Sequence, residues 1–327
     1  MGIRGTQDPL SNHYSWNEVV IMGYDIIGDI HGQDRKLTAL LGKLGYRIKD
    51  GAYRNPEGHT ALFLGDLIDR GPGQIEVINI VRNMIEAGSA QTIMGNHEWN
   101  AIGFGARNPD GSDFLRPRSE NKIREHKEFL RQVGMDSALH KELVGWFSNL
   151  PPVLDLGDIR LCHAWWSQDS IDAIVSVMHA DGSLDEAFLV SSFTKRTPAW
   201  RAMEDVTKGY EIELGNGATF LDHNGVARKE IRVSWWDASA TTYRKAALVP
   251  EDERVRIPDT PLPESVVLGV ASSVPTFVGH YWLSGKPGIQ NPTTAVLDYG
   301  AGLAGPLVAY RWNGESELTN DAFVAVG

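Results

Sequence analysis

Between residues 24 and 94 the chain alternates short apolar runs with stretches of helical periodicity, and this alternation constrains the fold more than any other feature. The apolar runs lie at residues 24–27, 61–64 and 92–94, and each is short enough to be a buried strand. Between them, apolar residues recur at the spacing of amphipathic helices: Leu37, Leu40, Leu41 and Leu44, then Ile75, Ile78, Val81 and Ile85. This β-α-β-α-β order predicts a parallel sheet covered by helices.

The rest of the chain changes character after this unit. Residues 103–149 are rich in Arg and Lys and carry an apolar stripe, which predicts a mostly helical segment. After Pro151-Pro152 the pattern predicts a hairpin over residues 153–162. Further strand-like runs lie at residues 231–235, 275–279, 294–297 and 307–311. We therefore expect one domain with two sheets over residues 22–327, preceded by a disordered leader or expression remnant at residues 1–21.

Composition excludes several classes of protein. The 42 acidic residues outnumber the 31 basic ones and give a net charge of −11. Such an acidic surface argues against a grip on duplex DNA or anionic lipid, so we expect no sequence-specific nucleic-acid binding. The single cysteine, Cys162, excludes a disulfide framework or a thiolate zinc cluster and is expected to be a buried bystander. No run of 18 apolar residues and no secretory signal is present, so we expect a cytoplasmic protein that does not bind membranes.

Three glycine-containing motifs follow the predicted parallel strands at their C-terminal ends. They are Gly28-Asp29-Ile30-His31-Gly32, Gly65-Asp66-Leu67-Ile68-Asp69-Arg70-Gly71 and Gly95-Asn96-His97-Glu98. Loops at this edge of an α/β sheet bind ligands, and glycine lets the chain turn sharply there. Two more histidines, His163 and His280, end later predicted strands. Carboxylate, imidazole and amide groups without a thiolate favour manganese, iron or zinc over calcium or copper.

The ordered motifs resemble those of the calcineurin-like metallophosphoesterase superfamily. The pattern is similar to a bacterial form of the branch that holds serine/threonine phosphoprotein phosphatases and symmetrical diadenosine tetraphosphatases, and it extends from residue 28 to residue 280. The resemblance implies a four-layer α/β/β/α sandwich with two mixed β-sheets and a dinuclear metal site at the C-terminal edge of the strands. It also implies that the helical segment, residues 103–150, is cap-like.

The same resemblance implies metal ligands and a reaction. Asp29 and His31 would bind the first metal, Asp66 would bridge both metals, and the second would be bound by Asn96, His163 and His280. The cofactor would be two divalent metal ions, manganese first, with iron or zinc as alternatives. A hydroxide bridging the metals would attack phosphorus.

Catalytic roles follow from the resemblance as well. Arg70 would hold the phosphoryl oxygens, because a guanidinium fork matches their geometry. His97 would protonate the leaving oxygen while Asp69 holds its ring. Asp298 would orient a ligand histidine from behind. Arg232 is the candidate for a second phosphate-binding arginine.

Other residues leave alternatives open. Trp99, Trp165, Trp166 and Trp282 follow the ligand motifs, and they would either form an aromatic wall for the substrate or anchor the motif loops in the core. The candidate substrate-binding residues are Arg232, Trp99 and Trp165.

The basic series from Arg107 to Arg131 is interrupted by glutamates, which favours a solvated helix face over a basic rim for the substrate. Six histidines fit no motif and are expected in loops or on the surface: His13, His59, His126, His140, His179 and His223.

Departures from the resembling families bear on the substrate. Symmetrical tetraphosphatases generally carry Ala-Arg-Gly where this chain has Asp69-Arg70-Gly71, so the Asp69–His97 pair instead resembles phosphoprotein phosphatases. We therefore expect a hydrolase of phosphate monoesters that acts on a phosphoprotein, a nucleotide or a small aryl phosphate. The alternatives are a symmetrical dinucleoside polyphosphate hydrolase and, from another class, a non-catalytic phospho-ligand binding or regulatory protein. The intact acid pair speaks against the latter.

Overall fold

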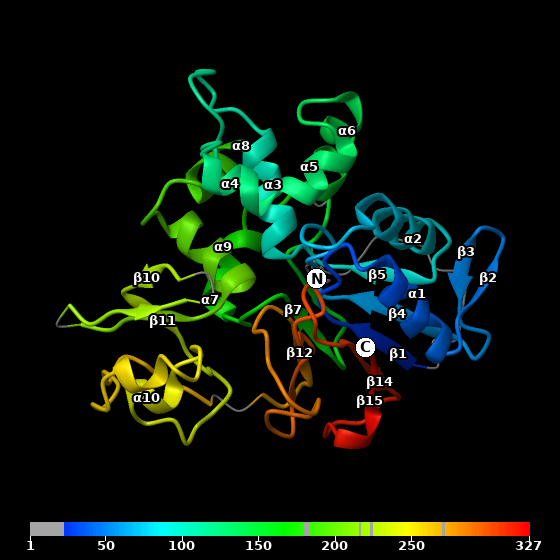
Figure 1. Ribbon diagram of the computed structural model, residues 1–327. Coiled ribbons are helices and arrows are strands. Elements are labelled where there is room, and N and C mark those ends of the chain that lie inside the picture. The colour runs from blue at the N-terminus through cyan, green and yellow to red at the C-terminus, as the bar shows by residue number, and fades with distance from the viewer. Residues whose placement is uncertain (1–22, 180–182, 216, 223–224, 270–271) are drawn as a thin grey trace, which may run out of the picture.

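Two mixed β-sheets form the centre of the molecule in the computed structural model, which describes residues 23–179, 183–215, 217–222, 225–269 and 272–327 (Figure 1). The leader expected at residues 1–21 lies outside the described residues, as do His13 and His223. Among the described residues, no helix combines the length and the apolar character needed to cross a membrane.

The first sheet contains the predicted parallel unit. Its strands lie in the order β15 (Phe323–Val326), β14 (Leu307–Trp312), β1 (Gly23–Ile27), β4 (His59–Phe63) and β5 (Ala90–Thr92). β1, β4 and β5 are parallel, whereas β14 and β15 are antiparallel to their neighbours. The parallel order is confirmed, but the third strand covers Ala90–Thr92 rather than the predicted residues 92–94.

Two helices connect the parallel strands, α1 (Asp34–Lys43) and α2 (Gln74–Glu86), and both lie beside the first sheet in Figure 1. They bury the periodic apolar residues identified in the sequence, among them Leu37, Leu40, Ile78 and Val81. A small hairpin at the outer edge comprises β2 (Arg47–Lys49) and β3 (Ala52–Arg54). The 3-10 helix η2 (Asn320–Ala322) leads directly into β15.

The second sheet has the order β13 (Thr294–Val296), β12 (Thr276–Val278), β7 (Arg160–Cys162) and β6 (Val153–Asp155). β12 is parallel to both neighbours, and β6 and β7 form the predicted hairpin. A buried cluster joins the two sheets, because it contains Ile26 and Leu62 of the first and Leu161 and Phe277 of the second. The α/β class with two mixed sheets is confirmed, and the four-layer order stays a prediction.

The upper part of the molecule in Figure 1 consists of helices that come after β5 and after β7 in the chain. The expected helical segment contains α3 (Asn96–Gly105), α4 (Glu120–Glu125), α5 (Lys127–Val133) and α6 (Ala138–Phe147). It begins earlier than expected, at Asn96, and residues 106–119 hold no helix. Three helices that the periodicity does not predict come after β7: α7 (Gln168–Val175), α8 (Glu186–Ser192) and α9 (Pro198–Lys208).

Residues 209–269 form a small lobe on the left of Figure 1. Its elements are β8 (Glu211–Glu213), β9 (Phe220–Leu221), β10 (Ala227–Arg228), β11 (Glu230–Arg232), α10 (Tyr243–Ala246) and the 3-10 helix η1 (Arg254–Arg256). Ile231, Val233 and Ile257 are fully buried in a hydrophobic cluster of the lobe's own. The strand predicted at residues 231–235 is shorter, because β11 ends at Arg232.

Candidate active site

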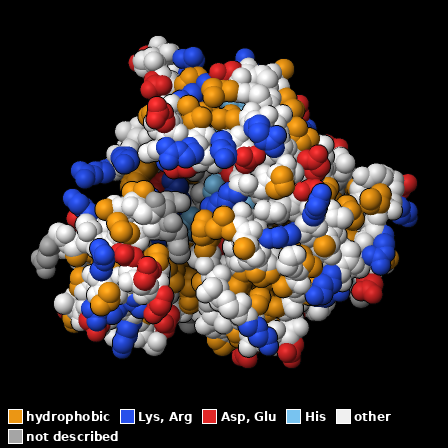
Figure 2. Space-filling model, in the orientation of Figure 1, with side chains coloured by type: hydrophobic (Ala, Val, Ile, Leu, Met, Phe, Trp, Pro, Cys, Tyr) orange, Lys and Arg blue, Asp and Glu red, His pale blue; other side chains and the backbone are white. Residues whose placement is uncertain are grey.

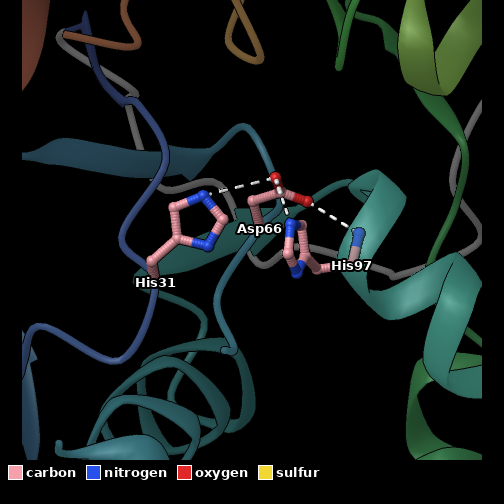
Figure 3. Close-up of side chains that lie close together, drawn as sticks. All are labelled: His31, Asp66 and His97. Atoms are coloured by element: carbon pink, nitrogen blue, oxygen red, sulfur yellow. Dashed lines mark hydrogen bonds and ion pairs between the residues drawn. The ribbon is translucent and has the colours of Figure 1, made fainter. Parts of the chain in front are cut away.

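The motif loops leave the C-terminal ends of β1, β4 and β5 and meet at one edge of the first sheet. Figure 3 shows His31 and Asp66 reaching from the loops after β1 and β4, while His97 comes from the first turn of α3. The second sheet contributes His163 after β7 and His280 after β12. All six predicted metal ligands are buried at this edge: Asp29, His31, Asp66, Asn96, His163 and His280.

Glycines permit two close approaches to the carboxylates. A Cβ atom at Gly95 would lie 2.2 Å from the backbone nitrogen and 2.3 Å from Oδ1 of Asp66. A Cβ atom at Gly279 would lie 2.0 Å from Oδ1 of Asp29. Both distances are far inside van der Waals contact, so only glycine lets the backbone pass so near the two carboxylates.

Backbone strain is concentrated at the same edge. Of the nine non-glycine residues with positive φ in the described part of the chain, six lie in or directly beside the motifs: His31, Asp66, Asp69, Arg70, His280 and Trp282. A left-handed conformation costs a residue with a Cβ atom roughly 1–2 kcal/mol. Strain of this kind persists where the surrounding structure imposes it, and it clusters at functional sites.

Asp66 lies at the centre of the histidine cluster. Its Oδ2 atom is 3.5 Å from Nε2 of His31 and 3.9 Å from Nε2 of His97, and its Oδ1 atom is 3.4 Å from Nε2 of His163. Burial opposes ionisation, but the three histidines, His163 first, outweigh it and hold the pKa of the Asp66 carboxyl well below its usual range. Asp66 is therefore an ionised carboxylate, with His31 and His97 next to one of its oxygens and His163 next to the other.

Asn96 and Asp29 connect the cluster to the second sheet. Oδ1 of Asn96 lies 3.1 Å from Nε2 of His163 and 2.8 Å from Nδ1 of His280. The Asp29 carboxylate accepts the backbone N–H of His280, at 3.2 Å and 3.0 Å to its two oxygens. The two sheets are thus joined through side chains predicted to bind metal.

The histidine rings are oriented from behind by backbone carbonyls. Nδ1 of His31 donates to the oxygen of Ile68 at 2.9 Å, and Nδ1 of His163 donates to the oxygen of Leu64 at 2.6 Å. With Nδ1 bonded to a carbonyl, Nε2 of each ring faces Asp66 and is the atom that could bind a metal. This is the usual arrangement of a metal-binding histidine.

These donors fit divalent metal ions. Two groups have ligand atoms within 4.8 Å of one another: His31, Asp66 and His97, and Asp66, His163 and His280. Nε2 of His31 and Nε2 of His280 are buried and have no hydrogen-bond partner among the described residues. Burial, Asp298 and Asp66 raise the pKa of Asp29 well above its usual range, which indicates concentrated negative charge that a cation would offset.

Asp69 and His97 form a hydrogen-bonded pair next to this cluster. Nδ1 of His97 donates to Oδ2 of Asp69 at 2.5 Å. Burial opposes the charge on His97, but Asp66 and Asp69 outweigh it and raise the pKa of the imidazole. The His97 side chain is 12% exposed, whereas that of Asp69 is 3% exposed. Figure 2 shows histidine side chains at the bottom of a hollow with Lys and Arg along its rim, so the cluster is open to solvent on one side.

Arg70 lies over the face of Trp282, with its guanidinium carbon 3.9 Å from the ring centroid. Its Nη2 atom is 3.5 Å from Nε2 of His97. Its Nη1 atom is buried and has no hydrogen-bond partner among the described residues. The stack on Trp282 therefore holds a guanidinium group with free donors beside His97.

Comparison with known proteins agrees with this geometry. A family model described as calcineurin-like phosphoesterase matches residues 22–214. The chain belongs to the calcineurin-like phosphoesterase family. The dependence of that family on two metals agrees with the two groups of ligand atoms around Asp66.

The two tetraphosphatase relatives described next match only parts of this phosphoesterase. The asymmetrical bis(5′-nucleosyl)-tetraphosphatase of Bacillus subtilis is 51% identical over 76 residues, which are 23% of this chain and 31% of that protein. The symmetrical bis(5′-nucleosyl)-tetraphosphatase of Aromatoleum aromaticum is 26% identical over 181 residues, 54% of this chain and 58% of that protein. A solved cold-active protein-tyrosine phosphatase from a Shewanella species is 17% identical, covers 94% of this chain and 81% of its own, and has a TM-score of 0.45. The chain thus spans less than a third of the length of the first of these relatives.

Glu98, the last residue of the third motif, organises the Asp66 loop of this phosphoesterase. Its buried carboxylate accepts the backbone N–H groups of Asp66 at 2.8 Å, Leu67 at 2.9 Å and Gly95 at 2.9 Å. Burial and the nearby Asp66 raise the pKa of Glu98 to about 7. The available signal is its position as third residue of α3, from which a glutamate reaches back to the start of the helix.

Two predicted residues have contacts that the sequence does not indicate. The Asp298 oxygens accept the backbone N–H groups of Trp282 and Gly300, each at 2.9 Å, so Asp298 holds the chain after His280 rather than a histidine ring. Arg232 lies on the lobe and pairs with Glu211 at 3.2 Å. Burial, then Arg232, lowers the pKa of His280 well below its usual range, which places the Arg232 charge near the cluster.

Trp99 and Trp165 differ in exposure, and a substrate contact of Trp165 stays a prediction. Trp99 is 2% exposed and stacks on Phe193, so the structure places it in the core and gives it no face toward a substrate. Trp165 is partly exposed and stacks on Tyr210 of the lobe, with ring centroids 4.3 Å apart. Cys162 is fully buried, as expected, and burial raises its pKa to about 12.

Three of the histidines expected in loops or on the surface are buried: His59, His126 and His140. The expectation is wrong for His59 and His140, because His59 lies in β4 and His140 lies in α6. His126 lies in the junction between α4 and α5 and is 3% exposed. Its Nδ1 atom donates to Oδ1 of Asp69 at 2.7 Å. No sequence motif indicates this contact, because 57 residues separate the partners.

Proposed function

We propose that this chain is a metal-dependent phosphomonoesterase that removes a phosphoryl group from a phosphoprotein, a nucleotide or a small aryl phosphate. The observation that carries the proposal is the placement of Arg70 beside His97. The group suited to hold phosphoryl oxygens lies 3.5 Å from the group suited to protonate a leaving oxygen. A protein that only bound phosphate would have no use for such a proton donor.

The chain's residues would hold two divalent metals, manganese first, with iron or zinc as alternatives. His97 also lies close to the proposed site of the first metal, because its ligand atom is within 4.8 Å of those of His31 and Asp66. The proposed ligands themselves are Asp29, His31, Asp66, Asn96, His163 and His280. When bound, the metals supply Lewis acidity toward phosphoryl oxygens and an activated water for in-line attack.

The side chains around the cluster perform the remaining steps. Arg70 donates from its guanidinium nitrogens to the phosphoryl oxygens and stabilises the charge that grows on them in the transition state. His97 gives its Nε2 proton to the leaving oxygen. Asp69 accepts from Nδ1 of His97, which fixes the ring orientation and favours the charged form. The raised pKa of His97 keeps that proton available near neutral pH.

Arg232 and Trp165 would contact the part of the substrate beyond the phosphoryl group. Tyr210, on which Trp165 stacks, accepts the backbone N–H of Val233, the residue after Arg232. The arginine and the aromatic stack therefore lie on the same ribbon of the lobe. The partly exposed Trp165 ring suits stacking on a nucleotide base or an aryl group, and the Arg232 charge suits a further phosphate.

A dinucleoside polyphosphate hydrolase is the second candidate function. The similarity to bis(5′-nucleosyl)-tetraphosphatases of Bacillus subtilis and Aromatoleum aromaticum favours it. The Asp69–His97 pair favours the monoesterase, because the sequence pattern of symmetrical tetraphosphatases generally lacks that aspartate. Products separate the two functions. A monoester yields orthophosphate, whereas diadenosine tetraphosphate yields two diphosphates after symmetrical cleavage or a mono- and a triphosphate after asymmetrical cleavage.

The test is the initial rate on p-nitrophenyl phosphate after chelation and manganese re-addition. We expect manganese to restore the rate in the wild type and not in Asp66→Asn. A matched control is Asp205→Asn, which changes a buried aspartate of α9 that is 5% exposed and distant in sequence from the motifs. Absence of metal-restored hydrolysis of both the monoester and diadenosine tetraphosphate, with bound metal detected, would refute both candidate functions.

A further inference from the structure

The second oxygen of the Asp69 carboxylate is used by a residue that no motif contains. Oδ2 of Asp69 accepts from His97, and Oδ1 accepts from Nδ1 of His126 at 2.7 Å. Burial opposes ionisation of Asp69, but His126 and then His97 outweigh it and lower the pKa of the carboxyl. An ionised carboxylate is only an acceptor, so both imidazoles donate to it. The result is a chain of three side chains, His126, Asp69 and His97.

The helix that follows His126 is fixed to the same loop at a second point. Oε1 of Gln132, near the end of α5, accepts the backbone N–H groups of Gln74 at 3.1 Å and Ile75 at 3.3 Å, and its Nε2 donates to the oxygen of Pro72. Oε1 of Gln74 in turn accepts the backbone N–H of Asp69 at 2.7 Å. The loop that carries Asp69 is therefore held by both ends of α5.

The surroundings of His126 keep its ring in one place. The ring packs against Phe129 with centroids 4.8 Å apart and against Phe104 with centroids 5.5 Å apart. Its Nε2 atom has no hydrogen-bond partner among the described residues. The one hydrogen bond that the structure gives the ring is thus the one to Asp69. A fixed donor at that position limits rotation of the Asp69 carboxylate.

We propose that His126 is a positioning residue for proton donation: it fixes the Asp69 carboxylate so that Asp69 keeps the His97 ring directed at the leaving group. This role rests on the proposed phosphomonoesterase function. Without His126, the buried Oδ1 atom loses its donor and the carboxylate can turn away from Nδ1 of His97. The helical segment then contributes to catalysis through a contact 57 residues away in sequence.

The test compares three variants on two substrates whose leaving groups differ in their need for a proton. His126→Phe keeps a ring among Phe104 and Phe129 but removes the donor. His126→Asn supplies an amide N–H close to the position of Nδ1. His140→Phe is the matched control, because His140 is also buried and contacts the same two phenylalanines, but its Nδ1 accepts the backbone N–H of Asp136 instead of bonding to Asp69.

We expect His126→Phe to lower kcat on phenyl phosphate by about 10–100-fold, the size typical when a supporting hydrogen-bond partner of a site is lost. The loss on p-nitrophenyl phosphate should be under about threefold, because nitrophenolate departs without a proton. KM should stay unchanged for both substrates. His126→Asn should recover most of the lost rate, and His140→Phe should behave like the wild type.

A second measurement does not depend on turnover. In the zinc-loaded protein, the Nδ1 proton of His97 should give a strongly downfield NMR signal, because it is shared with Asp69. His126→Phe should move or broaden that signal, and His140→Phe should leave it in place. An unmoved signal, or equal losses of kcat on the two esters, would overturn the proposal. A wild type that hydrolyses neither ester would refute the phosphomonoesterase, while the NMR comparison would still decide whether His126 positions the pair.

Discussion

Charged side chains differ in exposure between the motif loops at the sheet edge and the helical region, which comprises residues 106–147 and 168–208. In the loops, Asp29, Asp66 and Asp69 are buried and lie among histidines. In the helical region most charges pair at the surface, as in Arg118–Asp136 at 2.7 Å and Arg116–Glu125 at 2.8 Å, where both acidic side chains are more than half exposed. Exposed pairs contribute about 0–1 kcal/mol each, whereas buried groups interact strongly.

Because the charges are buried in one region and exposed in the other, we expect mutations in the two regions to have different effects. Changes in the loops should alter the reaction, and changes in the helical region should alter little or only stability. His126 is the exception to test, because it belongs to the helical region, is buried and bonds to Asp69. The basic series from Arg107 to Arg131 follows the general rule, since several of its members pair with neighbouring acids, as the expected solvated face would.

The largest effect is expected from His97→Ala in the loops. Removing a general acid lowers turnover by roughly 10²–10⁴-fold. The loss should be large on phenyl phosphate and much smaller on p-nitrophenyl phosphate, so the ratio of the two kcat values is the measurement. Equal losses on the two esters would show that His97 acts on the metals or the phosphoryl group instead of on the leaving oxygen.

A smaller effect is expected from Glu98→Gln. The amide keeps one acceptor oxygen but turns an NH₂ group toward the backbone donors of Asp66, Leu67 and Gly95. A buried donor left without its acceptor costs about 1–3 kcal/mol, so unfolding in urea should show a loss of about 2 kcal/mol. Manganese affinity should fall as well, because the Asp66 loop loosens.

The control for that change lies in the helical region. Glu125→Gln makes the same substitution in a side chain that is 52% exposed and that pairs with Arg116 and Lys122. Its cost should stay below about 1 kcal/mol. Equal costs for Glu98→Gln and Glu125→Gln would remove the contrast between the two regions.

The sequence predicts the loops better than the regions around them for a physical reason. The strand, the glycine turn and the ligand are adjacent in the chain, so Gly28 to Gly32 or Gly95 to Glu98 carry their own structural signal. The bond from His126 to Asp69 spans 57 residues and depends on how α5 packs against the loop. Most of the lobe at residues 209–269 is not predicted, apart from the strand run at residues 231–235, because its strands are two or three residues long and too short for an alternating pattern.

The stack of Arg70 on Trp282 should give the next smaller effect. Trp282→Leu removes the aromatic face 3.9 Å from the guanidinium carbon while leaving the arginine in place. A partly buried cation–π contact is worth about 1–2 kcal/mol, so kcat/KM should fall by about tenfold. The matched control is Trp146→Leu, since Trp146 lies under Arg82 at 5.5 Å in the helical region and should not change kcat/KM. An unchanged kcat/KM in Trp282→Leu would show that Arg70 needs no aromatic support.

The smallest effect concerns stability alone and comes from Asp205 of α9. Burial raises the pKa of Asp205 to about 6 from an ordinary 3.8, although Ser170 and Arg201 both bond to it. The folded chain therefore keeps a proton that the unfolded chain releases as pH rises from about 4 to 6. Through that window the folded state loses stability relative to the unfolded state, and Asp205→Asn removes this loss.

The measurement for Asp205 is the urea unfolding free energy of wild type and Asp205→Asn at pH 4 and at pH 8. One pKa unit corresponds to about 1.4 kcal/mol, and access of water to this helix reduces the effect, so the variant should gain about 1 kcal/mol on the wild type between the two pH values. Its kcat on p-nitrophenyl phosphate should not change. A difference in unfolding free energy that stays constant with pH would contradict the raised pKa. A lower kcat would instead show that α9 supports the reaction, as we propose for His126 at the junction before α5. The motif loops and the helical region would then differ in the exposure of their charges but not in their importance for catalysis.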